Sequence, residues 1–304
     1  MNILIVGGSG QIGGHAAILL QSKGHTVTTA GRHRPTSPPS LAALPFLTID
    51  YVAGNTTKEQ LTPFEAIVFA AGADMRQVPT GEDVDTWVFR ANTESVPAFA
   101  KLARSAGVKN FIHIGSFYPH ILPELVETSS YIRSHKIASD SVAALSTPEF
   151  SACSIDAPFV VGILPGMKIP MFEAYVQYAE GKLGLKETAP MGAINFISVR
   201  SLSEAIAGAL KNGPAVSGRT LLVGDENWTY ATYFGKFFSA VRKADVTITA
   251  TDEDHPMLPR AALFAGDRVV SYEPDADVVK ILGNYRRKDV QRAIEEIVAE
   301  YHTE

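Results

Sequence analysis

The chain has 304 residues, of which 46% are hydrophobic and 19% charged, and a formal net charge of −5 at pH 7. This composition supports a sizeable hydrophobic core and argues against disorder. At about 150 residues per domain, the length accommodates two domains or one large α/β domain with insertions. A negative net charge without a long basic run argues against nucleic acid and anionic membranes as partners.

Cysteine content and hydropathy indicate where such a protein works. Cys153 is the single cysteine, which excludes an intramolecular disulfide and is typical of a reducing compartment. The first apolar strand pattern starts at residue 2, which leaves no room for a signal peptide ahead of it. No apolar run approaches the length of about 18 residues that a membrane span needs. We therefore expect a cytoplasmic protein.

Residues 1–13, MNILIVGGSGQIG, combine a strand pattern with a glycine turn. Residues 2–6 are an apolar run ended by glycine, which is typical of a buried strand. Gly7, Gly10 and Gly13 follow with G-x-x-G-x-x-G spacing, and residues 12–23 are compatible with a helix. This is the first half of a βαβ unit, whose turn lets a pyrophosphate approach backbone N–H groups. A tight turn without a ligand is the alternative, but the flanking strand and helix favour a dinucleotide site.

Strand and helix patterns alternate through the first half of the chain. Further strands are predicted at 25–30, 46–50, 66–71, 110–114 and 150–155, and helices at 57–61, 83–106 and 131–145, with Pro97 bending or dividing the long helix. Residues 35–45 carry four prolines and are expected to form a loop or a broken helix. This alternation predicts an α/β fold with a mostly parallel, doubly wound sheet of the Rossmann type.

After Gly162 the rhythm changes. Glycines, prolines and short amphipathic pieces fill residues 163–194, and the segments 196–199, 202–211 and 221–223 look like a return to the sheet. Helices are predicted at 229–243 and 289–300, and a strand at 246–250. We therefore predict an NAD(P)-binding domain of residues 1–162, with 195–224 returning to it. Residues 163–194 and 225–304 would form a smaller α/β substrate-binding domain.

The end of the second predicted strand bears on cofactor selectivity. NAD-selective sites of this kind carry an acidic residue there for the ribose 2′-OH, whereas an arginine suits a 2′-phosphate. No Asp or Glu occurs between His25 and Pro45, and Arg32 directly follows Gly31. Since a guanidinium binds phosphate in a bidentate way, we expect NADP rather than NAD, with Arg32 as the phosphate ligand. A solvated loop at residues 32–34 is the alternative.

An ordered set of motifs over about residues 1–241 resembles the extended short-chain dehydrogenase/reductase family, which includes nucleotide-sugar epimerases and dihydroflavonol-type reductases. The motifs are the glycine turn, Asp50, Ala70-Ala71-Gly72, Asn92, Ser116, Tyr131 with Lys136, Pro158, Gly162 and the stretch 195–210. The resemblance implies a homodimer as a possible assembly, no metal, and cofactor contacts from Gly7, Gly10, Gln11, Ile12, Gly13, Arg32, Asp50, Ala70, Ala71, Gly72, Lys136 and Pro158. Asp50 would bind the adenine amino group, or else bond its own turn.

The resemblance also implies the reacting groups. Tyr131 would exchange a proton with the substrate oxygen, Ser116 would hold that oxygen, and Lys136 would lower the pKa of the tyrosine. Hydride would pass between the substrate carbon and the nicotinamide. Ser116 follows the fifth predicted strand, where ligands bind in such sheets, although it could instead cap a turn.

The spacing of this pair departs from the family's Tyr-x-x-x-Lys, because His135 stands four residues after Tyr131 and Lys136 stands five after it. On an α-helix the fourth residue lies about 40° from the tyrosine and the fifth about 140°. Three interpretations remain open. A late helix start or a π-bulge restores the pairing with Lys136, His135 replaces the lysine, or the pair is broken and the fold binds cofactor without turnover.

The substrate is expected to be a small, largely apolar carbonyl or alcohol. Ala157-Pro158 stands where many sugar-nucleotide members have Arg-Pro, and Arg200-Ser201 stands where acidic residues are usual, so neither supports a nucleotide sugar. Apolar residues in the later segments could line a pocket or form core: Phe159, Ile163, Met167, Met171, Phe172, Tyr175, Met191 and Phe196. We predict an NADP-dependent oxidoreductase. The alternatives are an epimerase or dehydratase that retains NAD, and a non-enzymatic NADP-binding regulatory protein.

Overall fold

A seven-stranded parallel sheet forms the larger part of the molecule in the computed structural model, which describes residues 1–73 and 78–302. Its strand order is β10-β6-β5-β4-β1-β2-β3, and every neighbouring pair is parallel. The strands are β1 (Asn2–Val6), β2 (Thr26–Gly31), β3 (Phe46–Thr48), β4 (Ala66–Phe69), β5 (Asn110–Ser116), β6 (Ser151–Ala157) and β10 (Thr220–Leu222). The predicted doubly wound α/β fold is therefore confirmed.

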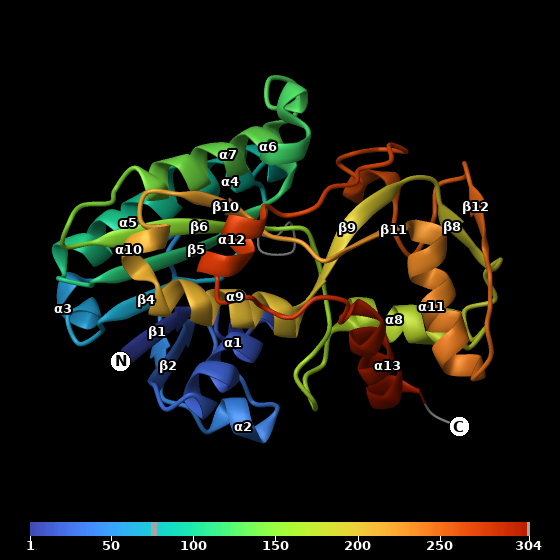
Figure 1. Cartoon of the computed structure of the whole chain (residues 1–304), viewed down its shortest axis with the longest axis horizontal. Coiled ribbons are helices and arrows are strands. Elements are labelled where there is room, and N and C mark those ends of the chain that lie inside the picture. Colours follow the sequence, from blue (N-terminus) through green and yellow to red (C-terminus); the bar gives the residue numbers. More distant parts are fainter. Residues whose placement is uncertain (74–77, 303–304) are drawn as a thin grey trace.

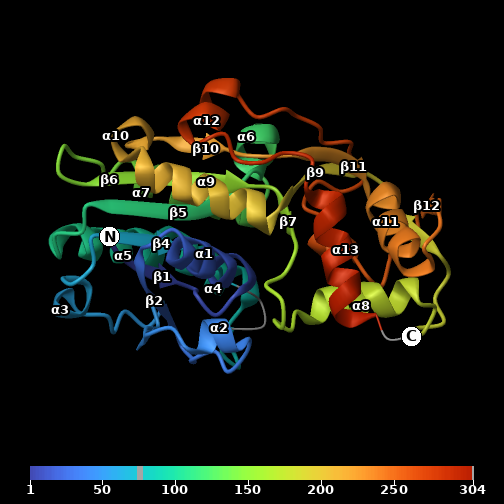
Figure 2. The same ribbon diagram turned by 60° about the horizontal axis from the view of Figure 1, so that its bottom comes forward.

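Helices cover both faces of this sheet (Figure 1). Helices α1 (Gln11–Ser22) and α9 (Val199–Lys211) pack on one face, and α5 (Val96–Ser105) and α7 (Ser130–Ala143) on the other (Figure 2). Strand β1 is apolar at every position from Ile3 to Val6 because both of its faces are buried. Ile3 and Ile5 belong to the core on the side of α1 and α9, and Leu4 and Val6 belong to the core on the side of α5 and α7. A parallel strand that is buried on both faces needs hydrophobic side chains at every position.

The helix predicted over residues 83–106 is divided. It consists of α4 (Val84–Arg90), a π-helical stretch η2 (Ala91–Ser95) and α5. Pro97 occupies the first turn of α5. Because a proline ring clashes with the carbonyl four residues earlier and donates no N–H, the widened π-helical turn directly before α5 accommodates it.

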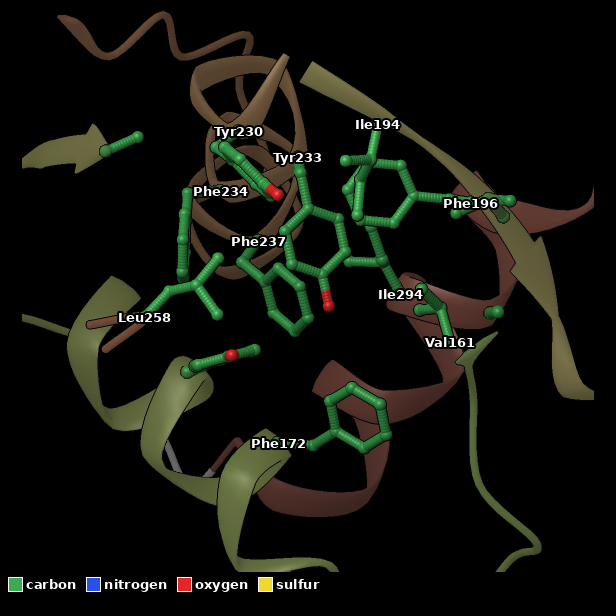
Figure 3. Close-up of a cluster of buried hydrophobic side chains, with 14 of the residues drawn as sticks. Val161, Phe172, Ile194, Phe196, Tyr230, Tyr233, Phe234, Phe237, Leu258 and Ile294 are labelled. Carbon is green, nitrogen blue, oxygen red and sulfur yellow. The ribbon is translucent and has the colours of Figure 1, made fainter. Parts of the chain in front are cut away.

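The smaller part of the molecule contains two short sheets. One has the order β11-β9-β7 and the other pairs β12 with β8. The strands are β7 (Phe159–Val161), β8 (Thr188–Pro190), β9 (Ala193–Ser198), β11 (Glu226–Thr229) and β12 (Thr249–Thr251), and the helices are α8 (Pro170–Ala179), α11 (Tyr230–Arg242) and α13 (Val290–Tyr301). Their core is aromatic, with Phe172, Tyr233, Phe234 and Phe237 packed together (Figure 3).

The prediction that residues 196–199 return to the large sheet was wrong. Strand β9 instead pairs with β7 and β11 in the three-stranded sheet, and the return begins with α9 and β10. All six residues of β9 are buried, and a fully buried strand has the same apolar pattern in either sheet. Hydrophobic pattern alone therefore could not assign β9 to its sheet.

The remaining elements are short. They are α2 (Pro39–Ala42), α3 (Lys58–Leu61), α6 (Tyr118–Ile121), η3 (Pro123–Leu125), α10 (Gly213–Val216), η4 (Arg260–Ala262) and α12 (Ala276–Ile281).

Across residues 1–73 and 78–302, no helix combines the length and the apolar character that crossing a membrane requires.

Candidate active site

The glycine turn brings three backbone segments into close contact. Gly7 has φ +82°, and a Cβ there would lie 2.6 Å from the Ala71 nitrogen. A Cβ on Gly13 would collide with the Gly7 carbonyl oxygen. No side chain caps the N-terminus of α1 at Gly10, which leaves the first N–H groups of the helix available to a ligand. This uncapped terminus and the absence of Cβ atoms fit a pyrophosphate.

A cavity of about 490 Å³ opens beside this turn, at the carboxyl ends of β1, β2 and β4. It brings together seven of the predicted cofactor residues: Gly7, Gly10, Arg32, Asp50, Ala70, Ala71 and Gly72. Ser9, Tyr51, Trp87 and Arg90 line it as well, and the sequence analysis did not identify them. The cavity thus lies where ligands bind in open α/β sheets.

Two of the predicted cofactor residues, Asp50 and Gln11, make hydrogen bonds within the protein. The Asp50 carboxylate accepts the backbone N–H groups of Val52 and Ala53, at 3.0 and 3.1 Å, so it also acts as a turn aspartate. Gln11 donates from its amide to the carbonyl oxygens of Val160 and Gly162, at 3.0 and 2.9 Å. Gln11 therefore ties α1 to the segment that leaves the large sheet.

Arg32 and Arg34 have different surroundings. Arg34 donates to the carbonyl oxygen of Leu44 at 3.2 Å and lies over the Phe46 ring. Arg32 is exposed, lines the cavity and forms no ion pair with any residue that the structure describes. The guanidinium of Arg32 is therefore available to a ligand in the cavity.

A second cavity, of about 260 Å³, contains the predicted reacting groups. Ser116 at the end of β5 and Tyr131 in the first turn of α7 both line it, together with Ile12 and Pro158. Burial raises the pKa of Tyr131 to about 12, although a side-chain hydrogen bond with Ser116 acts in the opposite direction. The Tyr131 phenol is therefore protonated at neutral pH.

Lys136 does not reach this cavity, contrary to the prediction. The Ser129 side chain accepts the Ile132 N–H and caps α7, which is a regular α-helix from Ser130 onward. Neither a late start nor a π-bulge shifts its register, so the fifth residue after Tyr131 faces away. Lys136 is exposed and donates from Nζ to Asp140 Oδ2 at 2.7 Å.

His135 takes the position beside the tyrosine. Its ring centroid lies 4.5 Å from that of Tyr131, and it lines the same cavity. Burial lowers the pKa of His135 to about 4, so the imidazole is neutral at pH 7. Its Nδ1 is buried without a hydrogen-bond partner in the described structure. Tyr131 consequently has a neutral imidazole as its neighbour instead of an ammonium group.

A sequence model of the NAD dependent epimerase/dehydratase family matches residues 3–173, which is more than half of the chain. The chain belongs to this family. Among the curated proteins compared with it, none matched.

Solved structures similar to this member of the epimerase/dehydratase family share its fold over the whole chain. A UDP-glucose-4-epimerase from Stenotrophomonas maltophila, with bound NAD and formylated UDP-arabinopyranose, has a TM-score of 0.74 at 18% identity and covers 99% of this chain and 98% of its own. The Bordetella bronchiseptica enzyme WbmH, in complex with NAD+, has a TM-score of 0.71 at 16% identity with 99% and 98% coverage. A reductase engineered to attenuate substrate inhibition in asymmetric catalysis has a TM-score of 0.70 at 15% identity with 100% and 99% coverage.

This epimerase/dehydratase family member also contains a buried polar network under α7. The Asp156 carboxylate, on β6, accepts hydrogen bonds from His120 Nε2 at 2.6 Å, Ser139 Oγ at 2.9 Å and Ser154 Oγ at 2.6 Å. A Cβ on Gly115, opposite Asp156 in the sheet, would collide with that carboxylate. The sequence analysis missed this network, although an aspartate inside an apolar strand is a usable signal for it.

The network also fixes a wall of the Tyr131 cavity. His120 lies in α6, the short helix that begins at Tyr118, and Tyr118 lines the cavity. The bond from His120 to Asp156 thus anchors α6 to β6, which keeps the Tyr118 ring in place.

The apolar residues predicted as a pocket lining mostly serve the core. Phe159 alone of the eight lines the Tyr131 cavity, and Phe172, Tyr175 and Phe196 are fully buried in the smaller part. The cavity is nevertheless apolar, because Ile114, Phe117, Tyr118, Ile194, Ala262 and Phe264 complete its walls.

Proposed function

We propose that the chain is an NADP-dependent reductase acting on a small, neutral carbonyl compound. The observation that carries this proposal is the pairing of Ser116 with a protonated Tyr131 in an apolar cavity of about 260 Å³. That volume is below the range of about 300–1,000 Å³ that is usual for drug-sized ligands. The wall of this cavity has no charged side chain among the residues that the structure describes.

The larger cavity supports the choice of NADP. The glycine turn would hold the pyrophosphate, and Arg32 at the end of β2 would pair with a 2′-phosphate. The WbmH and UDP-glucose-4-epimerase structures described above contain NAD, which lacks the 2′-phosphate. The basis for NADP here is local: Arg32 and His33 line the cavity directly after Gly31, where an NAD site has a carboxylate.

The protonation state of Tyr131 supports reduction as the direction of reaction. A bound nicotinamide supplies the hydride. Tyr131 would donate its proton to the oxygen of the substrate carbonyl, and Ser116 would donate a hydrogen bond to the same oxygen. Epimerisation or dehydration that starts by oxidising an alcohol needs a tyrosinate base. A phenol with a pKa of about 12 and a neutral neighbour is protonated at pH 7 and is better suited to act as the acid.

The smaller part of the molecule would bind the substrate. Residues 163–194 and 225–304 supply Ile194, Ala262 and Phe264 to the Tyr131 cavity, and β7, which precedes these ranges, supplies Phe159. We therefore extend the proposed substrate-binding part to the three-stranded sheet.

The decisive experiment measures NADPH oxidation by the purified protein across a panel of small aldehydes and ketones. The expected result is substrate-dependent loss of NADPH absorbance, with much slower oxidation of NADH. A protein that binds NADPH but oxidises it with no member of the panel would contradict the proposal. A protein that purifies with tightly bound NAD and shows no net turnover would favour an epimerase or dehydratase.

One observation favours a second candidate, a regulatory protein that binds NADP without turnover. Lys136, the group that would activate Tyr131, pairs with Asp140 outside the cavity. Replacing Tyr131 with Phe separates the two hypotheses. A reductase loses its activity, whereas a regulatory protein retains its NADP affinity and its partner binding.

A further inference from the structure

The wall of the Tyr131 cavity is unusually aromatic. Of the 15 described residues that line it, five are phenylalanine or tyrosine, whereas Phe, Trp and Tyr together make up 9% of the chain. The five are Phe117, Tyr118, Tyr131, Phe159 and Phe264. Aliphatic residues alone would make the wall apolar. Aromatic rings in addition favour a ligand that is itself a flat ring, because flat rings stack or meet edge to face.

Three of these rings are packed in a fixed arrangement. Tyr131 and Phe264 lie face to face, with ring centroids 3.7 Å apart and an interplanar angle of 3°. Tyr118 meets both rings edge-on, at 6.3 Å from Tyr131 and 5.8 Å from Phe264. Phe117 packs against Tyr118 at 4.1 Å. Stacked and edge-to-face contacts of this kind are favourable for flat rings, so a planar ligand can add to the same assembly.

Phe264 comes from a distant segment of the chain. It follows η4 and packs against Tyr131 and Tyr118, which belong to the larger part of the molecule. Its ring covers one face of the Tyr131 phenol, and Tyr131 shares the cavity with Ser116. One face of the phenol is therefore shielded by carbon, which leaves the hydroxyl as the group of Tyr131 that would bond the substrate oxygen.

The polar groups of the cavity exclude a charged ligand. Ser116, Tyr118, Tyr131 and His135 supply the polar side chains of its described wall, and His135 is uncharged at neutral pH. A diphosphate placed in this cavity would lose its hydration without gaining a cation as partner, which is strongly unfavourable. The wall instead suits one carbonyl oxygen at the Ser116–Tyr131 pair and an apolar ring beside it.

We propose that the substrates are aryl aldehydes or aryl ketones, an inference that rests on the proposed reductase function. Hydride from NADPH would form the new C–H bond at the carbonyl carbon as the C=O π bond breaks. The oxygen would take its proton from Tyr131, and one further proton taken up from the solvent would restore the phenol. Overall, one carbonyl compound, one NADPH and one proton from the solvent give one aryl alcohol and one NADP+, so electrons and protons balance.

The test compares two ketones that differ in one ring. Acetophenone and cyclohexyl methyl ketone have the same carbonyl and a similar volume, but only the first ring is aromatic. We expect kcat/KM with NADPH to be higher for acetophenone by up to about tenfold, the order of magnitude of one aromatic contact. UDP-glucose serves as the charged comparison compound and is expected to be neither bound nor turned over.

A substitution at Phe264 tests whether its ring causes the preference for acetophenone over cyclohexyl methyl ketone. Phe264→Leu keeps an apolar side chain and removes the ring, and it should lower kcat/KM for acetophenone more than kcat/KM for the cyclohexyl ketone, so that the ratio of the two falls towards one. Phe89→Leu, the same substitution at a half-buried position of α4 outside both cavities, is the matched control and should keep the preference. Because the comparison of ketones uses the unmodified protein, it stands even if Phe264→Leu does not fold.

Binding measurements separate this proposal from the proposed function. If neither ketone is reduced, acetophenone is tested for binding to the protein–NADP+ complex by saturation-transfer NMR. Binding that is lost in Phe264→Leu would support an aryl site while contradicting the reductase. Equal turnover of both ketones would overturn the aryl preference while leaving the reductase intact. Failure of acetophenone to bind or react, or turnover of UDP-glucose, would also overturn it.

Discussion

The glycine turn and the Tyr131 cavity depend on different kinds of chemistry. The turn is made of backbone: Gly7 and Gly13 are required because a Cβ would collide with main-chain atoms. The cavity is made of side chains from segments far apart in sequence: Ser116, Tyr131 and Phe264 all line it, and the rings of Tyr131 and Phe264 stack on each other. The glycine turn therefore depends on local backbone geometry. The charge next to Tyr131 depends instead on which side chain, His135 or Lys136, lies beside it.

Removing the Tyr131 hydroxyl should give the largest effect on turnover. A general acid contributes about 10²–10⁴-fold to rate, so Tyr131→Phe is expected to lower kcat by that factor and to leave NADP affinity unchanged. Tyr118→Phe is the control, because it removes a neighbouring hydroxyl and keeps the ring. Steady-state NADPH oxidation measures both variants. Equal activity of Tyr131→Phe and the unmodified protein would exclude Tyr131 as the acid.

Adding a Cβ in the glycine turn should lower both the folding stability and the affinity for NADP. Gly7→Ala is expected to destabilise the fold by about 3 kcal/mol or more and to abolish NADP binding, since backbone strain and a clash with the Ala71 nitrogen add together. Gly24→Ala is the matched control. Gly24 has φ +84°, but a Cβ added there would meet no atom within 4 Å, so strain alone should cost about 1–2 kcal/mol. Urea unfolding and NADP titration give the comparison, and equal costs would disprove the packing argument.

Arg32 tests whether side-chain charge also matters at the cofactor. A hydrogen bond to a charged group is worth about 1.5–3 kcal/mol, so Arg32→Ala should weaken NADP binding about 10- to 100-fold and leave NAD binding unchanged. Arg34→Ala is the control, because Arg34 is occupied with Leu44 and Phe46. Isothermal titration with both nucleotides provides the measurement. Equal losses for NADP and NAD would rule out a 2′-phosphate contact.

Lys136 should contribute almost nothing to turnover. Its ammonium group is exposed and pairs with Asp140, and exposed pairs are worth at most about 1 kcal/mol. Lys136→Ala is therefore expected to change kcat by less than about twofold, whereas His135→Ala should reduce it by disturbing the Tyr131 ring. A large loss in Lys136→Ala would mean that the helix changes its register when cofactor binds.

The pH dependence of reduction should be nearly flat. The acid form of Tyr131 is present below its pKa of about 12 and is lost above it. His135 becomes charged only near pH 4. With saturating NADPH and ketone, kcat should therefore be constant between about pH 6 and 9. A fall in kcat as pH rises through 7 would show that a cation depresses the tyrosine pKa after all.

Much of the fold followed from hydrophobic pattern, and residue spacing identified seven residues that line the larger cavity. The strands of the large sheet, the helix after the glycine turn and the division near Pro97 were all predictable, because local burial and proline geometry determine them. Strand β9 was placed in the wrong sheet, because its buried pattern fits either sheet. Asp50 and Gln11 were predicted as cofactor contacts, yet their partners within the protein depend on how turns and helices pack.

The sequence by itself determined that a strand, a glycine turn and a helix form a dinucleotide-type site, since those features are local and concern the backbone. It also raised the question of Tyr131 and Lys136, but it left three answers open. Only the tertiary structure decided among them, because the register of α7 directs His135 towards the tyrosine and Lys136 towards solvent. Phe264 and the Asp156 network were likewise decided in three dimensions, since long-range packing alone brings those groups beside Tyr131 and α7.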